Sequence, residues 1–127
     1  MPTAASAAPV DSPRASLWRI TDRQTFATLR EQGHRARRGT VSVTFLPAIG
    51  AAATQPPRAA FAISKAAGGA VVRNRIRRRL RAALRELGAA GELPAGAYLC
   101  SARPETAQMP WSALVSDVRA AVEAAIR

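Results

Sequence analysis

Arginine is concentrated in one short stretch of this 127-residue chain. Residues 70–85 contain no acidic residue and seven arginines, which are Arg73, Arg75, Arg77, Arg78, Arg79, Arg81 and Arg85. Like charges at this density repel one another, whereas a helix that faces only water normally alternates acidic and basic side chains. Guanidinium groups form paired hydrogen bonds to phosphate. The stretch therefore predicts a surface that binds a polyanion.

The same stretch has the periodicity of an amphipathic helix. At 100° per residue its apolar side chains fall within an arc of about 120°; they are Val72, Ile76, Leu80, Ala83, Leu84 and Leu87. We expect a helix from residue 69 or 70 to residue 87, with this arc in a core. The arginines form a stripe beside the arc (Arg73, Arg77, Arg81), a second stripe further round (Arg75, Arg78, Arg85) and one position on the opposite edge (Arg79).

The chain lacks the residue patterns of a self-sufficient catalyst. Its eight acidic residues are scattered, and none is spaced to pair with another or with His34, the only histidine. His34 lies in a basic segment, where phosphate contact or solvent exposure is expected. Cys100 is the only cysteine, which excludes an intrachain disulfide and a zinc site of the usual type; we expect it to be buried and inert. The sequence predicts a binding protein with no catalytic residue and no metal site.

Composition limits the partner and the number of domains. The net charge of +11 favours nucleic acid or another anionic surface, and no apolar run is long enough to span a membrane. Lys65 is the only lysine; this preference for arginine fits RNA or DNA contacts, and GC-rich codon usage would produce it equally well. We expect a disordered N-terminal tail over residues 1–16 and a single α/β domain over 17–127.

Hydrophobic periodicity predicts the remaining elements. A first helix is expected to begin at Thr21 or Asp22 and to end at Gly33. Alternation predicts strands within 40–48 and 58–65, joined by a hairpin-type loop over 47–57. A central strand over 97–104 and a helix after residue 110 complete an α/β sandwich. The strand–helix–strand unit around the arginine helix implies a parallel pair, with a right-handed crossover by default.

Two further features bear on binding. Phe26, on the first helix, is either a platform on which a base stacks or a core residue. Lys65 and Arg38 extend the positive surface over the sheet, and the helix start after Gly68 and Gly69 offers free amides to one phosphate.

The segment 61–86, FAISKAAGGAVVRNRIRRRLRAALRE, resembles the protein subunit family of bacterial ribonuclease P. The family motif runs as a strand, S-K-K, a glycine, A-V-x-R-N-R-I-K-R and an arginine-rich helix. Its matches here are Ser64, Lys65, Gly68, Ala70, Val71, Arg73, Asn74, Arg75, Ile76, Arg78 and Arg81. The resemblance extends from about Leu17 to the C-terminus and includes Phe26, Leu29 and Gly33.

The resemblance implies a fold and a function. The fold is a two-layer α/β sandwich on a small four-stranded sheet, with a left-handed crossover in place of the default hand. The protein assists the endonucleolytic removal of the 5′ leader from precursor tRNA in the cytoplasm. Its partners are precursor tRNA and a catalytic RNA that carries out the hydrolysis with Mg²⁺ bound mainly by RNA. No membrane and no further protein are required.

The resemblance also assigns residues. Contact with RNA falls to Lys65, Arg73, Asn74, Arg75, Arg77, Arg78, Arg79, Arg81 and Arg85. The cleft for the single-stranded leader, between the first helix and the sheet, falls to Phe26, Arg38, Ser42, Thr44, Arg73 and Arg77. Alternation supports Ser42 and Thr44, because both point away from the apolar face of their strand.

Three positions depart from the family pattern. Ala66 replaces the second lysine of S-K-K, Ala60 replaces a glycine of the preceding strand, and Arg30 replaces a second aromatic residue of the first helix. One positive charge and one stacking platform are lost with them. The alternative function is that of a ribosomal-type or general RNA-binding protein without a catalytic partner. A DNA-binding protein is disfavoured because no helix-turn-helix pairing precedes the basic helix.

Overall fold

The computed structural model describes residues 16–127. Its helices are α1 (Arg23–Gln32), α2 (Ala70–Ala89) and α3 (Trp111–Ile126). Its strands are β2 (Trp18–Arg19), β3 (His34–Arg38), β4 (Val41–Pro47), β5 (Arg58–Phe61) and β6 (Gly96–Ala102). Short 3₁₀ helices are η3 (Gly50–Thr54), η4 (Lys65–Ala67) and η5 (Pro104–Ala107). The predicted tail, residues 1–16, lies outside the described residues except for its last position.

The strands form one mixed sheet in the order β2-β5-β6-β4-β3. β2 and β6 pair with β5 in parallel, whereas β4 pairs with β6 and β3 in antiparallel fashion. The predicted parallel pair around α2 and the central position of residues 97–102 are confirmed. The α/β sandwich is confirmed with five strands in place of four, because the two-residue β2 adds an edge. The hand of the crossover stays a prediction.

The segment 47–57 is not the hairpin-type loop that the sequence predicted. β6 lies between β4 and β5, so the segment crosses over a strand and contains η3. Tyr98 shows the arrangement, because it is opposite Phe45 on one side and Ala59 on the other. Alternation identifies a strand but does not identify its neighbour in the sheet.

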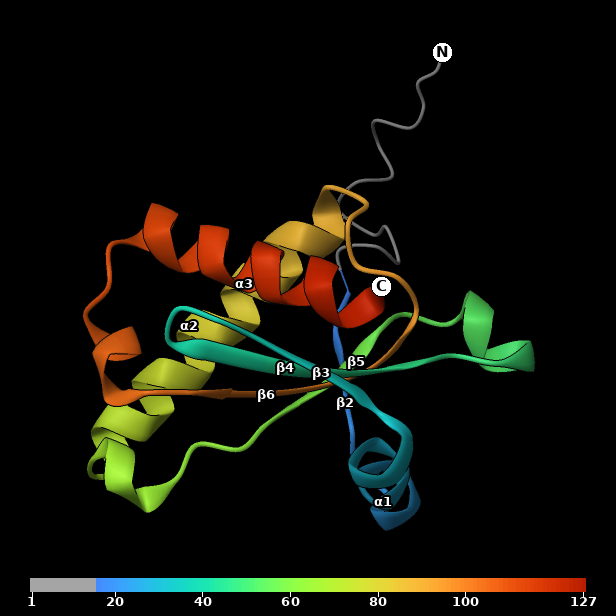
Figure 1. The fold of residues 1–127 in the computed structure, drawn as a ribbon, viewed down its shortest axis with the longest axis horizontal. Coiled ribbons are helices and arrows are strands. Elements are labelled where there is room, and N and C mark those ends of the chain that lie inside the picture. The colour runs from blue at the N-terminus through green and yellow to red at the C-terminus, as the bar shows by residue number, and fades with distance from the viewer. Residues whose placement is uncertain (1–15) are drawn as a thin grey trace.

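One face of the sheet packs against α2 and α3, which lie together on the same side in Figure 1. This core buries Val41, Val43, Tyr98 and Cys100 from the strands. It also buries the predicted apolar arc of α2, namely Ile76, Leu80, Ala83, Leu84 and Leu87, with Val72 packed at its margin. Burial raises the pKa of the Cys100 thiol to about 12, so this cysteine stays protonated, as expected of an inert core residue.

The opposite face is covered in part by α1 (Figure 1). Ile20, Leu29 and Ala97 form a small buried cluster there. α1 begins after Asp22, whose Oδ2 accepts a hydrogen bond from the backbone N–H of Thr25 at 2.9 Å, and ends at Gly33 as predicted. Because α1 is only ten residues long, part of this sheet face remains uncovered.

Within residues 16–127, no helix is both long and apolar enough to cross a membrane.

Candidate nucleic-acid interface

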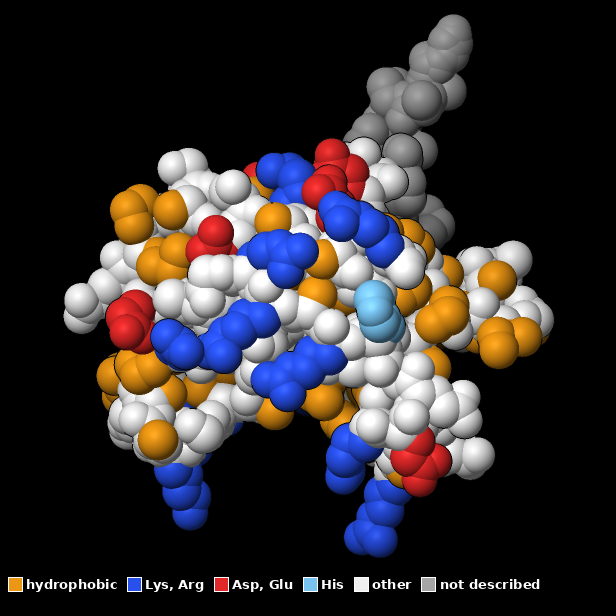
Figure 2. All heavy atoms as spheres, viewed as in Figure 1, with side chains coloured by type: hydrophobic (Ala, Val, Ile, Leu, Met, Phe, Trp, Pro, Cys, Tyr) orange, Lys and Arg blue, Asp and Glu red, His pale blue; other side chains and the backbone are white. Residues whose placement is uncertain are grey.

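The arginines of α2 differ in how far they are exposed. Arg75, Arg78 and Arg85, the stripe predicted to lie furthest from the core, are exposed, whereas Arg73, Arg77 and Arg81 are half-buried beside the apolar arc. This is the division that the helical periodicity predicted. Figure 2 shows basic side chains spread over one face of the molecule, with acidic side chains in small separate groups. The protein therefore presents a large positive surface to a polyanion.

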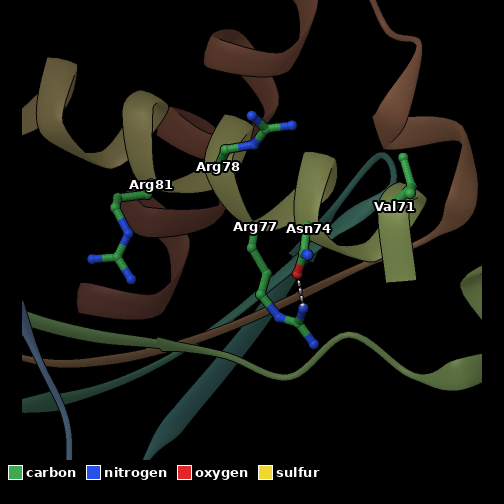
Figure 3. A pocket seen from close by; sticks show the side chains of 5 residues that line it. All are labelled: Val71, Asn74, Arg77, Arg78 and Arg81. Carbon is green, nitrogen blue, oxygen red and sulfur yellow. Dashed lines mark hydrogen bonds between the residues drawn. The ribbon is translucent and has the colours of Figure 1, made fainter. Parts of the chain in front are cut away.

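A hollow of about 510 Å³ lies along the α2 surface. Its lining consists of Val71, Asn74, Arg77, Arg78 and Arg81 (Figure 3). Nη1 of Arg77 donates a hydrogen bond to Oδ1 of Asn74 at 2.8 Å. Figure 3 shows Arg77 and Arg81 extending to one side of the helix and Arg78 to the other. Asn74 thus orients a guanidinium group at the edge of a space that a phosphate can enter.

Arg81 belongs to a second hollow, of about 330 Å³, at the junction of α2 with β2 and β5. Arg19 and Arg77 also line it, and the ring of Phe61 lies below Arg81. Burial, followed by the charges of Arg19 and Arg85, lowers the pKa of Arg81. The hollow gathers three arginines, and no salt bridge to any of them is present within residues 16–127. Sequence reasoning missed Arg19, because a two-residue strand carries no periodicity.

Arg79 is directed into the protein. Its guanidinium donates hydrogen bonds to the carbonyl oxygens of Thr106 and Met109, the first at 2.6 Å, and lies 5.9 Å from the centre of the Trp111 ring. The guanidinium of Arg79, which the resemblance assigns to RNA contact, therefore contacts backbone carbonyl groups of the protein itself. Thr106 and Met109 lie 27 and 30 residues after Arg79 in the chain, so no local pattern in the sequence indicates these hydrogen bonds.

The uncovered part of the sheet carries a second group of basic side chains. Arg35 is opposite Thr44, and Arg37 is opposite Ser42; opposed residues point to the same face. Ser42 is buried and Thr44 is half-buried on this face. A hollow of about 210 Å³ lies here, lined by Arg35, Arg37, Thr40, Ser42, Ala62, Ser64, Ser101, Ala102 and Arg103. The predicted face of Ser42 and Thr44 is thus a basic groove.

The structure does not bring Arg38 to this groove. Arg38 is opposite Val41 and therefore lies on the face that packs against α2 and α3, where its Nη1 donates to the Arg37 carbonyl. Arg35 and Arg37 line the groove in which the resemblance predicts Arg38. The turn at Gly39 and Thr40 was the available signal, since pairing across a two-residue turn fixes which arginines share a face with Ser42.

Phe26 belongs to α1, which covers the same face of the sheet as the basic groove. Its side chain is half-buried and packs with Leu46, Ala60 and Leu99 against the α1 cluster. Leu99, which packs against the same cluster, precedes Ser101 by two residues on β6, so Phe26 and the basic groove lie on one face of the sheet. Phe26 combines partial core packing with an exposed portion.

The remaining candidates lie apart from the groove or have protein partners. Lys65 is exposed on η4. Arg73 is half-buried, and its Nε has no hydrogen-bond partner within residues 16–127. Nδ1 of His34 lies 2.7 Å from the carbonyl oxygen of Ala125, so this exposed ring ties β3 to α3. No group of three or more His, Cys, Asp or Glu side chains in the described part of the chain could hold a metal ion.

Comparison with known proteins identifies the family. Residues 15–125 match the family Ribonuclease P. Ribonuclease P protein components from Thermobifida fusca and Kocuria rhizophila are 40% and 41% identical over 121 and 105 residues. These alignments cover 91% and 80% of this chain and 79% and 86% of the relatives.

Solved structures support the fold. The ribonuclease P proteins of Staphylococcus aureus and Thermotoga maritima align with TM-scores of 0.67 and 0.68 at 20% and 16% identity. The alignments cover 84% and 83% of this chain and 93% and 94% of those chains. With a family match over nearly its whole length, the chain belongs to the ribonuclease P protein family, the RNA-partnered protein subunits of a bacterial endoribonuclease.

Proposed function

We propose that this protein binds the catalytic RNA of ribonuclease P through the exposed face of α2 and the 5′ leader of precursor tRNA through the sheet face beside α1. The observation that carries the proposal is that Phe26 and the basic groove at Ser42 lie on the same face of the sheet. A single strand needs both an aromatic platform and a positive track for its backbone.

The exposed stripe of α2 fits the catalytic RNA. Arg75, Arg78 and Arg85 point to solvent, and their guanidinium groups can pair with phosphates of a folded RNA. Such contacts release counterions and give an affinity that falls steeply with salt. They position the protein without reading sequence, because phosphates are the same at every nucleotide.

The groove fits the leader. Arg35, Arg37 and Arg103 supply positive charge, and the hydroxyl groups of Ser42 and Ser101 can donate to phosphate or ribose oxygens. The half-buried ring of Phe26 offers its free portion to a base. Mature tRNA has no leader and does not fill this groove.

The protein does not supply the reacting groups in this proposal. Acidic and imidazole side chains in residues 16–127 form no cluster that fits Mg²⁺, so we assign no step of the hydrolysis to a protein-bound ion. The Mg²⁺ required by the reaction is assigned mainly to the RNA. This chain orients the leader relative to the catalytic RNA, and it acts in the cytoplasm, where precursor tRNA is made.

Reconstitution tests the proposal. We expect the purified chain alone to leave precursor tRNA uncut, and the chain with its cognate RNA subunit and Mg²⁺ to cleave at the mature 5′ end. Arg37→Ala is expected to weaken holoenzyme binding of precursor tRNA with a long leader, whereas the matched control Arg38→Ala, one residue away on the opposite face, is not. Sustained cleavage by the RNA-free chain, or equal effects of the two variants, would contradict the proposal.

A further inference from the structure

A third hollow lies between α2 and the start of α3. It has a volume of about 320 Å³ and is lined by Arg75, Arg78, Arg79, Ala82 and Trp111. Trp111 is 40% exposed, so part of its large apolar side chain is open to the solvent beside the hollow. None of the acidic residues in the described part of the chain lines the hollow. Neither the family match nor the predicted RNA-contact residues assign any role to Trp111.

We propose that this hollow binds one unpaired nucleotide of the RNA subunit, with its base stacked on the Trp111 indole and its phosphate held by Arg75 and Arg78. The inference rests on the proposed function, in which the exposed face of α2 meets that RNA. It adds a base-stacking site to a surface otherwise described by phosphate contacts alone.

Contacts within the protein hold the Trp111 indole in place in the absence of a ligand. Arg79 donates hydrogen bonds to the carbonyl oxygens of Thr106 and Met109, and its guanidinium approaches the Trp111 ring to 5.9 Å from the centroid. Trp111 is also the first residue of α3, directly after Pro110, whose ring restricts the backbone at that point. A stacking surface that is already fixed loses little side-chain entropy when a base binds.

The charges of the hollow select the class of ligand. Two exposed arginines, Arg75 and Arg78, stand beside an aromatic face, a combination typical of sites for single-stranded nucleic acid. The leader groove lies on the opposite face of the sheet from α2, so the leader is assigned elsewhere. The RNA subunit is the ligand that already contacts this side of α2 in the proposed function.

Tryptophan fluorescence tests the contact directly. The chain has two tryptophans, so Trp18→Phe leaves Trp111 as the only indole. We expect the cognate RNA subunit to quench the emission of this variant, because a stacked base lies in van der Waals contact with the ring. Absence of quenching at saturating RNA, with binding confirmed by mobility shift, would overturn the proposal.

Affinity measurements with the RNA subunit give a second, independent test. Trp111→Leu is expected to raise the Kd by about 5- to 150-fold, the range observed when a stacking residue is removed, and Trp111→Phe by much less. The matched control is Trp18→Leu, which changes a similarly exposed tryptophan (48%) on the far edge of the sheet and is expected to leave the Kd unchanged. Equal Kd values for Trp111→Leu and Trp111→Phe would exclude stacking.

The outcomes separate this inference from the proposed function. If Trp111→Leu binds normally while Arg75→Ala and Arg78→Ala weaken binding, the stacking site is wrong and the RNA partner stands. If Trp111→Leu weakens only the binding of free precursor tRNA, the stacked nucleotide belongs to precursor tRNA and the assignment to the RNA subunit is wrong. If the wild-type chain does not bind the RNA subunit, the proposed function fails. Thermal melting identifies loss of folding in Trp111→Leu, and in that case the quenching and Trp111→Phe results decide.

Discussion

The guanidinium carbon of Arg81 lies 4.9 Å from the centre of the Phe61 ring, so a cation of α2 rests on an aromatic residue of β5. The ring attracts the cation, while Arg19 and Arg85 repel it. The aromatic contact thus holds Arg81 in place, and its guanidinium has no salt-bridge partner among residues 16–127. An anion that enters the adjoining hollow relieves this repulsion.

Sulfate or phosphate is therefore expected to stabilise the free protein. A ligand that binds only the folded state raises its stability by mass action, and a divalent anion fits between Arg19, Arg77 and Arg81. The melting temperature should be higher in sulfate than in chloride at equal ionic strength. The double variant Arg19→Gln/Arg81→Gln should lose most of this difference. Identical melting curves of the wild-type chain in the two salts would show that the hollow is not an anion site.

Removal of the exposed arginines is expected to change the salt dependence of RNA binding. Arg75→Gln and Arg78→Gln each delete one phosphate contact in the proposed function. The slope of log affinity against log salt should lose about 0.7–0.9 in magnitude for each contact. Filter binding with the RNA subunit at several salt concentrations measures it, with Arg38→Gln as the charge-matched control. A slope equal to that of the control would place these arginines outside the interface.

Phe26 is expected to act through its exposed portion. Phe26→Leu preserves most of the apolar packing against the cluster of Ile20, Leu29 and Ala97 but removes the aromatic face. Binding of long-leader precursor tRNA by the holoenzyme should weaken by about 1–3 kcal/mol, with mature tRNA almost unaffected. Titrations over a series of leader lengths measure this. A lower melting temperature with equal losses for both tRNAs would assign Phe26 to the core instead.

Arg79 is expected to support stability more than RNA binding. Arg79→Ala removes the two hydrogen bonds that the charged guanidinium donates to the carbonyl oxygens of Thr106 and Met109. We therefore expect the free energy of unfolding to fall by about 2 kcal/mol. Urea unfolding measures this. The control is the exposed neighbour Arg78: we expect Arg78→Ala to change the free energy of unfolding by less than about 0.5 kcal/mol. Similar values for the two variants would mean that the carbonyl contacts contribute little.

Acid is expected to weaken the start of α1. The Thr25 hydroxyl and then its N–H donate to the Asp22 carboxylate and lower the Asp22 pKa below its ordinary value of 3.8. The pKa of Asp22 is lower in the folded state than in the unfolded state. The stabilisation by the Asp22 carboxylate is therefore complete above pH 3.8, the ordinary pKa, and is lost as the pH falls through the folded-state pKa. Asp22→Asn remains a good cap but does not titrate there. Its melting temperature should fall less than that of the wild-type chain below about pH 4; parallel curves would refute this.

Local periodicity predicted much of the fold. The apolar arc of α2 was predicted at Ile76 and Leu80 because a helix imposes its period on whatever face enters the core. The stop at Gly33 and a cap at Thr21 or Asp22 follow from the sequence because capping chemistry is local, and the structure selects Asp22. The family motif assigns RNA contact to α2 because its residues are contiguous, and this assignment stays a prediction.

The features that sequence reasoning missed depend on contacts between distant segments. The insertion of β6 between β4 and β5 is invisible to alternation, and it turned an expected hairpin into a crossover. The resemblance assigns Arg79 to RNA contact, but the carbonyl partners of its guanidinium lie on η5 and before α3, far along the chain. The resemblance assigns Arg38 to the cleft, whereas the register across Gly39 places Arg37 opposite Ser42 and Arg38 opposite Val41.

The central position of β6 has a consequence for how the chain folds. β6 is the last strand in the sequence, and yet it lies between β4 and β5 and joins the β3–β4 hairpin to the β2–β5 pair. Before residues 96–102 emerge from the ribosome, the sheet exists only as the β3–β4 hairpin and the short β2–β5 pair, neither of which is stable alone. Closure must then wait for contacts across long sequence separations, which slows folding. Synthesis of the last quarter of the chain thus converts two separate fragments into one cooperative unit.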